Sequence, residues 1–435
     1  SRTSMFGGRG HAVCRWLTWR ACRLPIKSRT SMCGRLSPSG SACRWCDPSL
    51  NPGRGIIEET AMRTAMRITC HRRSLAAALA TARGVIPART PKTILKNVKL
   101  RLTEDRATLL ATNSEVGIRS EVSGVESDSV GEVLLPAKQV TEILREVQDD
   151  VIVLEVDEGG LRIRTADNEF KLAVDDPAEF PDVAMFDDDA YWTVPGRQLK
   201  QAIQRTIFAI DTKNARYALG GVLVEVSPAT ITLAATDCHR LAVAQTPCSQ
   251  CGEPSAGQRP VVPAKAMRLI EQSVGKGEQE VHLAVHDDSV LVRSGTSTIY
   301  ARLVAGRFPK YRDVIPRNPP ICIELVAGPL LSAVQQSAMV ASDKRCGVDF
   351  AFADGNLILA SVGADAGCSR VELPVSYQGE PITITFDPKF VADFLKVLKP
   401  SASLSLGLTA PNDPVVFRVG SDYTYVLMPM ARWGR

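Results

Sequence analysis

A chain of 435 residues with 45% hydrophobic residues is long enough for about three domains with their own cores. No apolar run approaches the roughly 20 residues that a membrane-spanning helix needs, so no membrane span is predicted. The net charge of +5 is uneven: residues 1–61 hold ten Lys/Arg and three Asp/Glu, a net +7, which leaves −2 for residues 62–435. The nearly neutral body argues against a strongly basic, sequence-reading DNA binder.

Residues 1–61 differ from the rest of the chain in composition and show neither a helical nor a strand period. They contain five of the twelve cysteines and three of the five tryptophans, and they repeat SRTSM at Ser1 and Ser28. An Arg-rich, acid-poor leader is one signature of an organelle transit peptide, but the Trp, Cys and Gly content fits that signature poorly. We expect an unstructured leader from a misplaced start, with translation beginning at Met62 or Met66.

The cysteines of the body are odd in number and scattered: Cys70, Cys238, Cys248, Cys251, Cys322, Cys346 and Cys368. This usage is typical of reduced thiols and predicts a cytoplasmic protein. Cys248 and Cys251 form a lone CxxC, whereas a structural zinc site needs four ligands. We therefore expect neither a metal nor another cofactor.

The pattern of one short amphipathic helix recurs three times in the body, over Leu135–Val147, Val262–Val274 and Phe386–Leu398. Their prolines, Pro136, Pro263 and Pro388, stand 127 and 125 residues apart. A repeat this long indicates three copies of one domain rather than a solenoid of small units. Proline suits the first turn of a helix, because its missing N–H would have no partner there.

A lysine recurs on the first turn of each copy, at Lys138, Lys265 and Lys389. A cation at that position works mildly against the helix dipole, so its repetition suggests a shared anionic partner. The alternative is that lysine only solubilises an amphipathic helix, and the sequence leaves both interpretations open.

The same order of signals returns in each repeat. A helix comes first, over Arg72–Val85, Gly196–Ile210 and Gly328–Ser342. Alternating strands follow, in the second repeat over Gly220–Ser227, Ala229–Asp237 and His239–Thr246. After the recurring helix a meander closes the repeat, over Val151–Val174, Glu280–Val304 and Leu404–Met428. Antiparallel strands with helices segregated to one side predict an α+β fold with domains over 62–187, 188–315 and 316–435.

His239 is the one histidine whose neighbours suggest a functional site, in TDCHRLA (Thr236–Ala242). A Cys beside a His suggests a nucleophile and its base, but neighbouring strand residues point to opposite faces. We favour a tight turn in which Asp237 bonds its own backbone. Phosphate-loop, GxSxG, HExxH and GxGxxG motifs are missing from the sequence.

Three stretches together carry a resemblance: TDCHRLA, GRFPKYRDVIP (Gly306–Pro316) and YVLMPM (Tyr425–Met430). Over about residues 66–430 the chain resembles the bacterial beta sliding clamps, the beta subunits of DNA polymerase III. The resemblance implies the DNA-clamp fold, with three similar domains per chain. Two chains would join head to tail in a ring, with helices lining the hole and antiparallel sheets outside. Such a ring performs no chemistry and binds no cofactor.

The resemblance also implies site residues, position by position. The partner-peptide pocket would comprise Leu219, Thr236, His239, Arg240, Leu241, Pro309, Val314, Val426, Leu427, Met428, Pro429 and Met430. Contacts to DNA would come from Arg89, Lys213, Arg216 and Lys265. The dimer interface would set Phe170 against Met339 and Val340.

The chain departs from the family at three places. Cys238 stands where the family usually has glycine, and Asp313 stands where some members carry arginine. The sequence also continues past the usual end with Ala431–Arg435, and we expect Trp433 to lie against the pocket. These differences bear on peptide binding rather than on the fold.

The sequence thus predicts a homodimeric sliding clamp that encircles double-stranded DNA without reading its sequence. Its other partners would be the catalytic subunit of the replicative polymerase, the clamp loader and further proteins with a clamp-binding motif. A trimeric clamp of the archaeal or eukaryotic kind is a rival, but such chains carry two repeats. A DNA-modifying enzyme with a site around His239 is a rival from another class.

Overall fold

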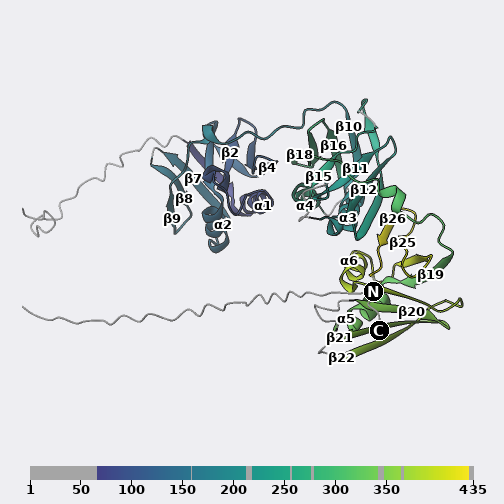
Figure 1. Ribbon diagram of the computed structural model, residues 1–435. Helices are drawn as coiled ribbons and strands as arrows, with labels where there is room; N and C mark the ends of the chain where they lie inside the picture. Colours follow the sequence, from purple (N-terminus) through teal and green to yellow (C-terminus); the bar gives the residue numbers. More distant parts are fainter. Residues whose placement is uncertain are drawn as a thin grey trace, which may run out of the picture. The chain divides into compact units, whose positions relative to one another are not determined.

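The computed structural model describes residues 66–430, except 158, 212–217, 255–256, 276–278, 341–346 and 364–366. The leader predicted over residues 1–61 and the extension Ala431–Arg435 both lie outside this description. The described residues confirm a threefold repeat of helices and antiparallel strands (Figure 1). None of the helices in these residues is long and apolar enough to cross a membrane.

Each repeat follows one order of elements. The first repeat comprises β1 (Met66–His71), α1 (Arg72–Ala82), the 3-10 turn η1 (Thr93–Lys96), β2 (Asn97–Leu102), β3 (Ala107–Thr112), β4 (Val116–Val122), β5 (Val125–Ser127), β6 (Gly131–Pro136), α2 (Ala137–Glu146), β7 (Val151–Asp157), β8 (Gly160–Arg164), β9 (Glu169–Leu172) and η2 (Pro177–Glu179). A strand, a helix, a group of strands, a second helix and a closing meander therefore make one unit.

The other two repeats match this order. The second comprises β10 (Tyr191–Pro195), α3 (Gly196–Thr206), η3 (Ile207–Ala209), β11 (Gly221–Val226), β12 (Thr230–Thr236), β13 (Arg240–Pro247), β14 (Ser249–Cys251), β15 (Val261–Pro263), α4 (Ala264–Ser273), β16 (Glu280–Val285), β17 (Ser289–Ser294), β18 (Ser297–Arg302) and η4 (Tyr311–Val314). The third comprises β19 (Ile321–Val326), α5 (Ala327–Ala338), β20 (Val348–Ala353), β21 (Asn356–Gly363), β22 (Gly367–Pro374), β23 (Ile382–Phe386), α6 (Pro388–Lys396), β24 (Ser403–Leu408), β25 (Val415–Val419) and β26 (Tyr423–Leu427).

Prolines open the recurring helices less uniformly than the sequence predicts. Pro388 lies inside α6, at its first residue. Pro136 and Pro263 instead end a strand with non-helical backbone angles, and α2 and α4 begin one residue later. Sequence reasoning also missed the strand before each first helix, because β1, β10 and β19 are short and adjoin their helices directly.

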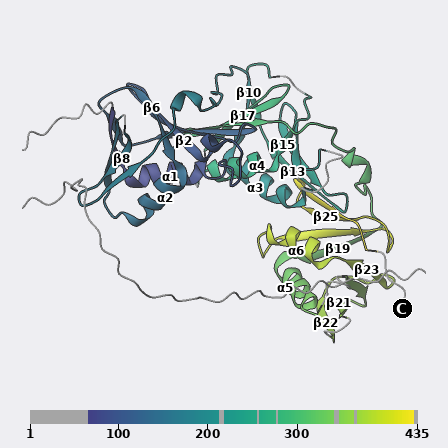
Figure 2. The same cartoon turned by 60° about the vertical axis from the view of Figure 1, so that its left-hand side comes forward.

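Within the described residues the strands form four antiparallel sheets, and two of these sheets run through more than one repeat (Figure 2). In the nine-stranded sheet β18 pairs with β4, with Ile299 opposite Ile118. In the eight-stranded sheet β13 pairs with β26, with Ala242 opposite Tyr425. Successive repeats are therefore joined by backbone hydrogen bonds between sheet edges.

The two helices of each repeat pack on each other, α1 on α2, α3 on α4 and α5 on α6 (Figure 1). Their apolar faces lie on the sheets, as the 3.6-residue period predicts. In the third repeat the fully buried ring of Phe394 stacks on Tyr425 with a centroid distance of 4.7 Å. Since Tyr425 lies on β26, this stack places α6 over the strand that joins the second repeat.

Candidate partner-binding site

The turn between β12 and β13 is tight and held by its own side chains. Asp237 Oδ1 accepts hydrogen bonds from the backbone N–H groups of His239 (3.0 Å) and Arg240 (2.9 Å). Thr236 Oγ1 donates to the carbonyl of Arg240 at 2.7 Å. Cys238 has a φ of +72°, in the left-handed region that favours glycine. The predicted turn with Asp237 bonding its own backbone is confirmed.

The arrangement does not support a nucleophile at Cys238. The second oxygen of Asp237 accepts from Arg240 Nε at 2.9 Å, so both carboxylate oxygens are engaged. The ring Nδ1 of His239 lies 3.2 Å from the backbone oxygen of Asp237. Among the hydrogen bonds of the described residues, none joins the Cys238 thiol to the imidazole. General-base catalysis needs that contact or a water-mediated equivalent.

A pocket of about 240 Å³ opens beside this turn, between the second repeat and the end of β26. It is lined by Thr236, Cys238, His239, Arg240, Leu241, Pro309, Lys310, Tyr311, Val314, Val426 and Met428. Eight of the twelve residues predicted for the pocket are among them. Val314 and Met428 are large apolar side chains that remain exposed there.

The other four predicted residues lie elsewhere. Leu219 is buried under the pocket in the cluster of Leu241 and Val426. Leu427 belongs to the main core on the opposite side of the sheet, because side chains alternate along β26. Met430 lines a separate hollow, and its backbone N–H donates to the carbonyl of Thr385 at 2.9 Å. Pro429, between Met428 and Met430, lines neither cavity.

Sequence reasoning missed three lining residues: Cys238, Lys310 and Tyr311. Each belongs to a stretch that carried the resemblance, so their place in the motif was the available signal. The strand alternation that excludes Leu427 was equally visible in the sequence.

One wall of the pocket is anchored by Arg240, which is only 8% exposed. Besides Asp237, its guanidinium donates to Asp393 Oδ2 on α6 (2.9 Å) and to the carbonyl of Phe208 (2.8 Å). It also lies 4.4 Å from the ring centroid of Phe390. Burial acts to lower the pKa of Arg240, but the hydrogen bond to Asp393, the neighbouring Tyr425, and the charge and hydrogen bond of Asp237 together outweigh it and raise the pKa.

The opposite wall is anchored by Glu225 of β11. Its Oε2 accepts from the hydroxyl of Tyr311 and from Arg312, each at 2.6 Å, and its Oε1 pairs with Arg259 at 2.5 Å. Burial and the hydrogen bond to Glu225 raise the pKa of Tyr311 to about 12, so the phenol stays protonated as a donor. The 3-10 turn that carries Val314 is thereby fixed on the sheet.

The residues predicted to touch DNA differ in their exposure and in whether the structure describes them. Arg89 is exposed in the loop after α1. Lys265 is half-buried, and its ammonium donates to the carbonyl of Val85 at 2.7 Å, which ties α4 to the loop after α1. Burial lowers the pKa of Lys265, partly offset by Glu115. Lys213 and Arg216 lie outside the described residues.

The residues predicted for the dimer interface lie at two sheet ends. Phe170 is half-buried on β9, the last strand of the five-stranded sheet. Met339, directly after α5, is 79% exposed, and Val340 follows it half-buried. β22 is the last strand at one end of the four-stranded sheet.

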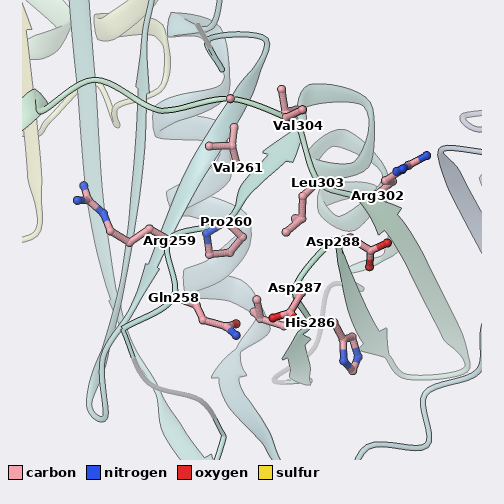
Figure 3. A pocket seen from close by; sticks show the side chains of 13 residues that line it. Gln258, Arg259, Pro260, Val261, His286, Asp287, Asp288, Arg302, Leu303 and Val304 are labelled. Carbon is pink, nitrogen blue, oxygen red and sulfur yellow. The ribbon is translucent and has the colours of Figure 1, made fainter.

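A second hollow of about 460 Å³ lies within the second repeat (Figure 3). Its lining carries Asp287 and Asp288 as well as Arg259 and Arg302. The two arginine side chains extend to opposite sides of the hollow (Figure 3), so their charges do not converge. No ligand class is favoured by this mixture. Within the described ranges, no group of three or more His, Cys, Asp or Glu side chains is placed to hold a metal ion.

Comparison with known sequences decides the family. The N-terminal, central and C-terminal domain families of the DNA polymerase III beta subunit match residues 66–184, 193–310 and 312–431. The chain belongs to the DNA polymerase III beta subunit family. The predicted resemblance and the predicted clamp fold are both confirmed, and three domains exclude a clamp chain built from two.

Individual relatives cover the same region. The beta sliding clamp of Vibrio cholerae is 27% identical over 368 residues, 84% of this chain and 100% of the relative. That of Proteus mirabilis is 29% identical over 371 residues, again 84% and 100%. The crystal structure of the polymerase III beta subunit from Pseudomonas aeruginosa aligns with a TM-score of 0.77 at 26% identity, covering 84% and 100% of the two chains. The Bacillus subtilis clamp, at 22% identity, TM-score 0.79 and coverage of 85% and 100%, supports the fold.

The function predicted from the sequence is that of this beta subunit family. The chain is a DNA sliding clamp that tethers DNA polymerase III, a processivity factor without a catalytic step of its own. The rival interpretation as a DNA-modifying enzyme is therefore set aside.

The strained turn gives a first testable expectation. Changing Cys238 to Gly should raise the free energy of unfolding by about 1 kcal/mol, because glycine adopts a φ of +72° without strain. Urea denaturation measures the change. The matched control is Cys322→Gly on β19, an exposed strand residue, which should lower the stability by about 0.5–1 kcal/mol. Equal destabilisation by both changes would contradict the assigned strain.

Proposed function

We propose that the chain closes a homodimeric ring around double-stranded DNA and presents the pocket beside the β12–β13 turn to partner proteins. The observation that carries this proposal is the match of three successive beta-subunit domains across residues 66–431. We assign the domains to 62–187, 188–315 and 316–435, with 1–61 as a leader. The helices would line the hole and the antiparallel sheets would form the outside.

A head-to-tail seam follows from the sheet ends. Within the described residues β9 and β22 each pair on one side only, so each offers unpaired backbone groups. Exposed apolar side chains accompany them, with Met339 at the end of α5 and Val362 on β21. Phe170 on β9 is the aromatic counterpart on the first domain. In a twofold-symmetric dimer, the first-domain surface of each copy would meet the third-domain surface of the other. Two identical seams would then close the ring without leaving a free end.

Partner proteins would dock an extended apolar segment into the pocket. Met, Leu, Val and Pro side chains form an adaptable groove that accepts more than one sequence. The replicative polymerase, the clamp loader and other proteins with a clamp-binding motif would compete for it. Such work takes place where the chromosome is, in the cytoplasm of a bacterial cell.

Contacts with DNA would be few and would not read bases. Arg89, Lys213, Arg216 and Lys265 are the proposed phosphate contacts. An ammonium group has three donors, so Lys265 keeps two after bonding Val85. Lys138 and Lys389, on the first turns of α2 and α6, are exposed and add to the positive potential. Weak, non-specific attraction suits a ring that has to slide.

Docking is tested with a dye-labelled peptide that carries two leucines and a phenylalanine. Val314→Glu and Met428→Glu each place a charge on the apolar lining, so the dissociation constant should rise at least about tenfold. Fluorescence anisotropy measures it. Val326→Glu, an exposed valine on β19 outside this pocket, is the matched control and should leave binding unchanged. Equal affinity in all three variants would refute docking at this pocket.

The seam is tested by analytical ultracentrifugation. Changing Met339 to Glu together with Val340 to Lys should weaken the dimer at least about 100-fold, because unpaired charges would be buried against Phe170 of the second copy. The variant should keep the native circular dichroism spectrum. Met185→Glu changes another exposed methionine and serves as the control. A variant that still sediments as a stable dimer would place the seam elsewhere.

Encirclement is tested by retention. Binding to short linear duplex should be no tighter than about 10⁻⁴ to 10⁻⁶ M and should fall steeply with salt. A ring loaded on closed circular DNA should survive high salt, and linearising the circle should release it. Neutralising Arg89 should weaken linear binding and reduce the salt slope by about one unit, with little effect on retention by circles. Equal loss from closed and cut circles would overturn the topological mechanism.

A further inference from the structure

Arg240 lines the docking pocket, yet its polar atoms are already engaged within the chain. Nε donates to Asp237, one terminal nitrogen donates to Asp393 and the other donates to the carbonyl of Phe208. The ring of Phe390 covers one face of the guanidinium. A group held on so many sides cannot turn toward an incoming peptide without breaking hydrogen bonds to partly buried carboxylates.

These contacts cross the joint between two repeats. Arg240 begins β13 of the second repeat, and Asp393 and Phe390 belong to α6 of the third. The same joint is made by backbone pairing of Arg240 with Leu427 and by the hydrogen bond from Met428 N–H to the carbonyl of His239, at 2.9 Å. The wall formed by Met428 and the wall formed by His239 therefore keep their spacing only while this joint holds.

We propose that Asp393 is a positioning residue of the docking pocket and acts through Arg240. The inference rests on the proposed docking function of the pocket. Asp393 is not among the residues that line the pocket, so its proposed effect on docking is indirect. Its carboxylate fixes the guanidinium against α6, and the fixed guanidinium keeps the turn and the end of β26 in register with each other.

Loss of this carboxylate has two consequences. The joint loses a charge-assisted hydrogen bond, whose removal commonly costs enough to change an equilibrium five- to thirtyfold. The guanidinium also loses a compensating negative charge on its α6 side, which leaves more positive charge beside the pocket. The altered pocket should then bind an apolar peptide more weakly and favour a peptide that carries a carboxylate.

The experiment measures dissociation constants of the dimeric protein for two probes. One is the dye-labelled peptide with two leucines and a phenylalanine, and the other has an added glutamate. For Asp393→Asn we expect at least about fivefold weaker binding of the neutral peptide. The ratio of acidic to neutral affinity should rise by at least about threefold, a change that general loosening of the fold would not produce.

Asp354→Asn is the matched control. It removes the same charge from an exposed turn between β20 and β21, and asparagine tolerates the φ of +48° there. This variant should bind both peptides like the wild type. Thermal melting and sedimentation of every variant establish that the dimer remains folded.

A double-mutant cycle separates action through Arg240 from an independent effect. In an Arg240→Met background, Asp393→Asn should cause no further loss of affinity for the neutral peptide, so the two changes should be non-additive. If Asp393→Asn alone fails to fold, the affinities of Arg240→Met and of the double variant for the neutral peptide are compared instead. Equal affinities support action through Arg240. Additive losses would overturn the proposal.

The outcomes also distinguish this inference from the proposed function. If neither peptide binds the wild type, the pocket is not a docking site and the proposed function fails. If both peptides bind the wild type and Asp393→Asn equally well, docking stands and the positioning role of Asp393 is wrong. If Arg240→Met alone abolishes the preference between peptides that the wild type shows, Arg240 contacts the partner's carboxylate directly and the proposal also fails.

Discussion

The backbone groups at the edges of the sheets must find partners, and the rest of this structure depends on how they do so. An unpaired strand edge is open to association with any other strand. Here the first and second repeats satisfy one pair of edges by joining β4 to β18, and the second and third satisfy another by joining β13 to β26. The repeats are therefore joined by regular hydrogen bonding, and side-chain anchors such as Arg240 with Asp393 reinforce a joint that the backbone has already defined.

The pocket is a consequence of the second joint. Pairing Arg240 with Leu427 brings the turn at Cys238 next to the end of β26, where the chain leaves the sheet. Strand alternation then directs Val426 to the pocket side and Leu427 to the main core. Glu225 completes the far wall by holding Tyr311. Residues from three distant stretches thus converge because two sheet edges meet.

Much of this arrangement could be predicted from the sequence, because it depends on local patterns. The helical period and the spacing of Pro136, Pro263 and Pro388 predict the repeats, and the turn at Asp237 follows from side-chain chemistry that acts over a few residues. The family resemblance supplied most of the pocket lining. The strands before α1, α3 and α5 were missed, because a short strand that leads straight into a helix carries no separate period.

Long-range partners could not be predicted in the same way. Nothing in the sequence near Lys265 indicates that its ammonium bonds the carbonyl of Val85, nor that Arg240 and Asp393, 153 residues apart, form an ion pair. Such pairs depend on which sheet edges join. The composition of the strands did not indicate which edges would pair between repeats. A motif therefore predicts which part of the fold a residue lies in more reliably than it predicts which group its charged side chain binds.

The distribution of charge follows the same distinction between the joints and the exposed helices. Arginines at the joints are partly or largely buried and paired with carboxylates, as Arg205 is with Asp422 and Arg240 is with Asp393. Their charge is compensated inside the protein and contributes little to the field at a distance. The lysines at the starts of α2 and α6 remain exposed. Under the proposed function, a body with a net charge near zero would attract duplex DNA only weakly through these exposed lysines. Closure of the ring would then supply the retention that those few charges could not.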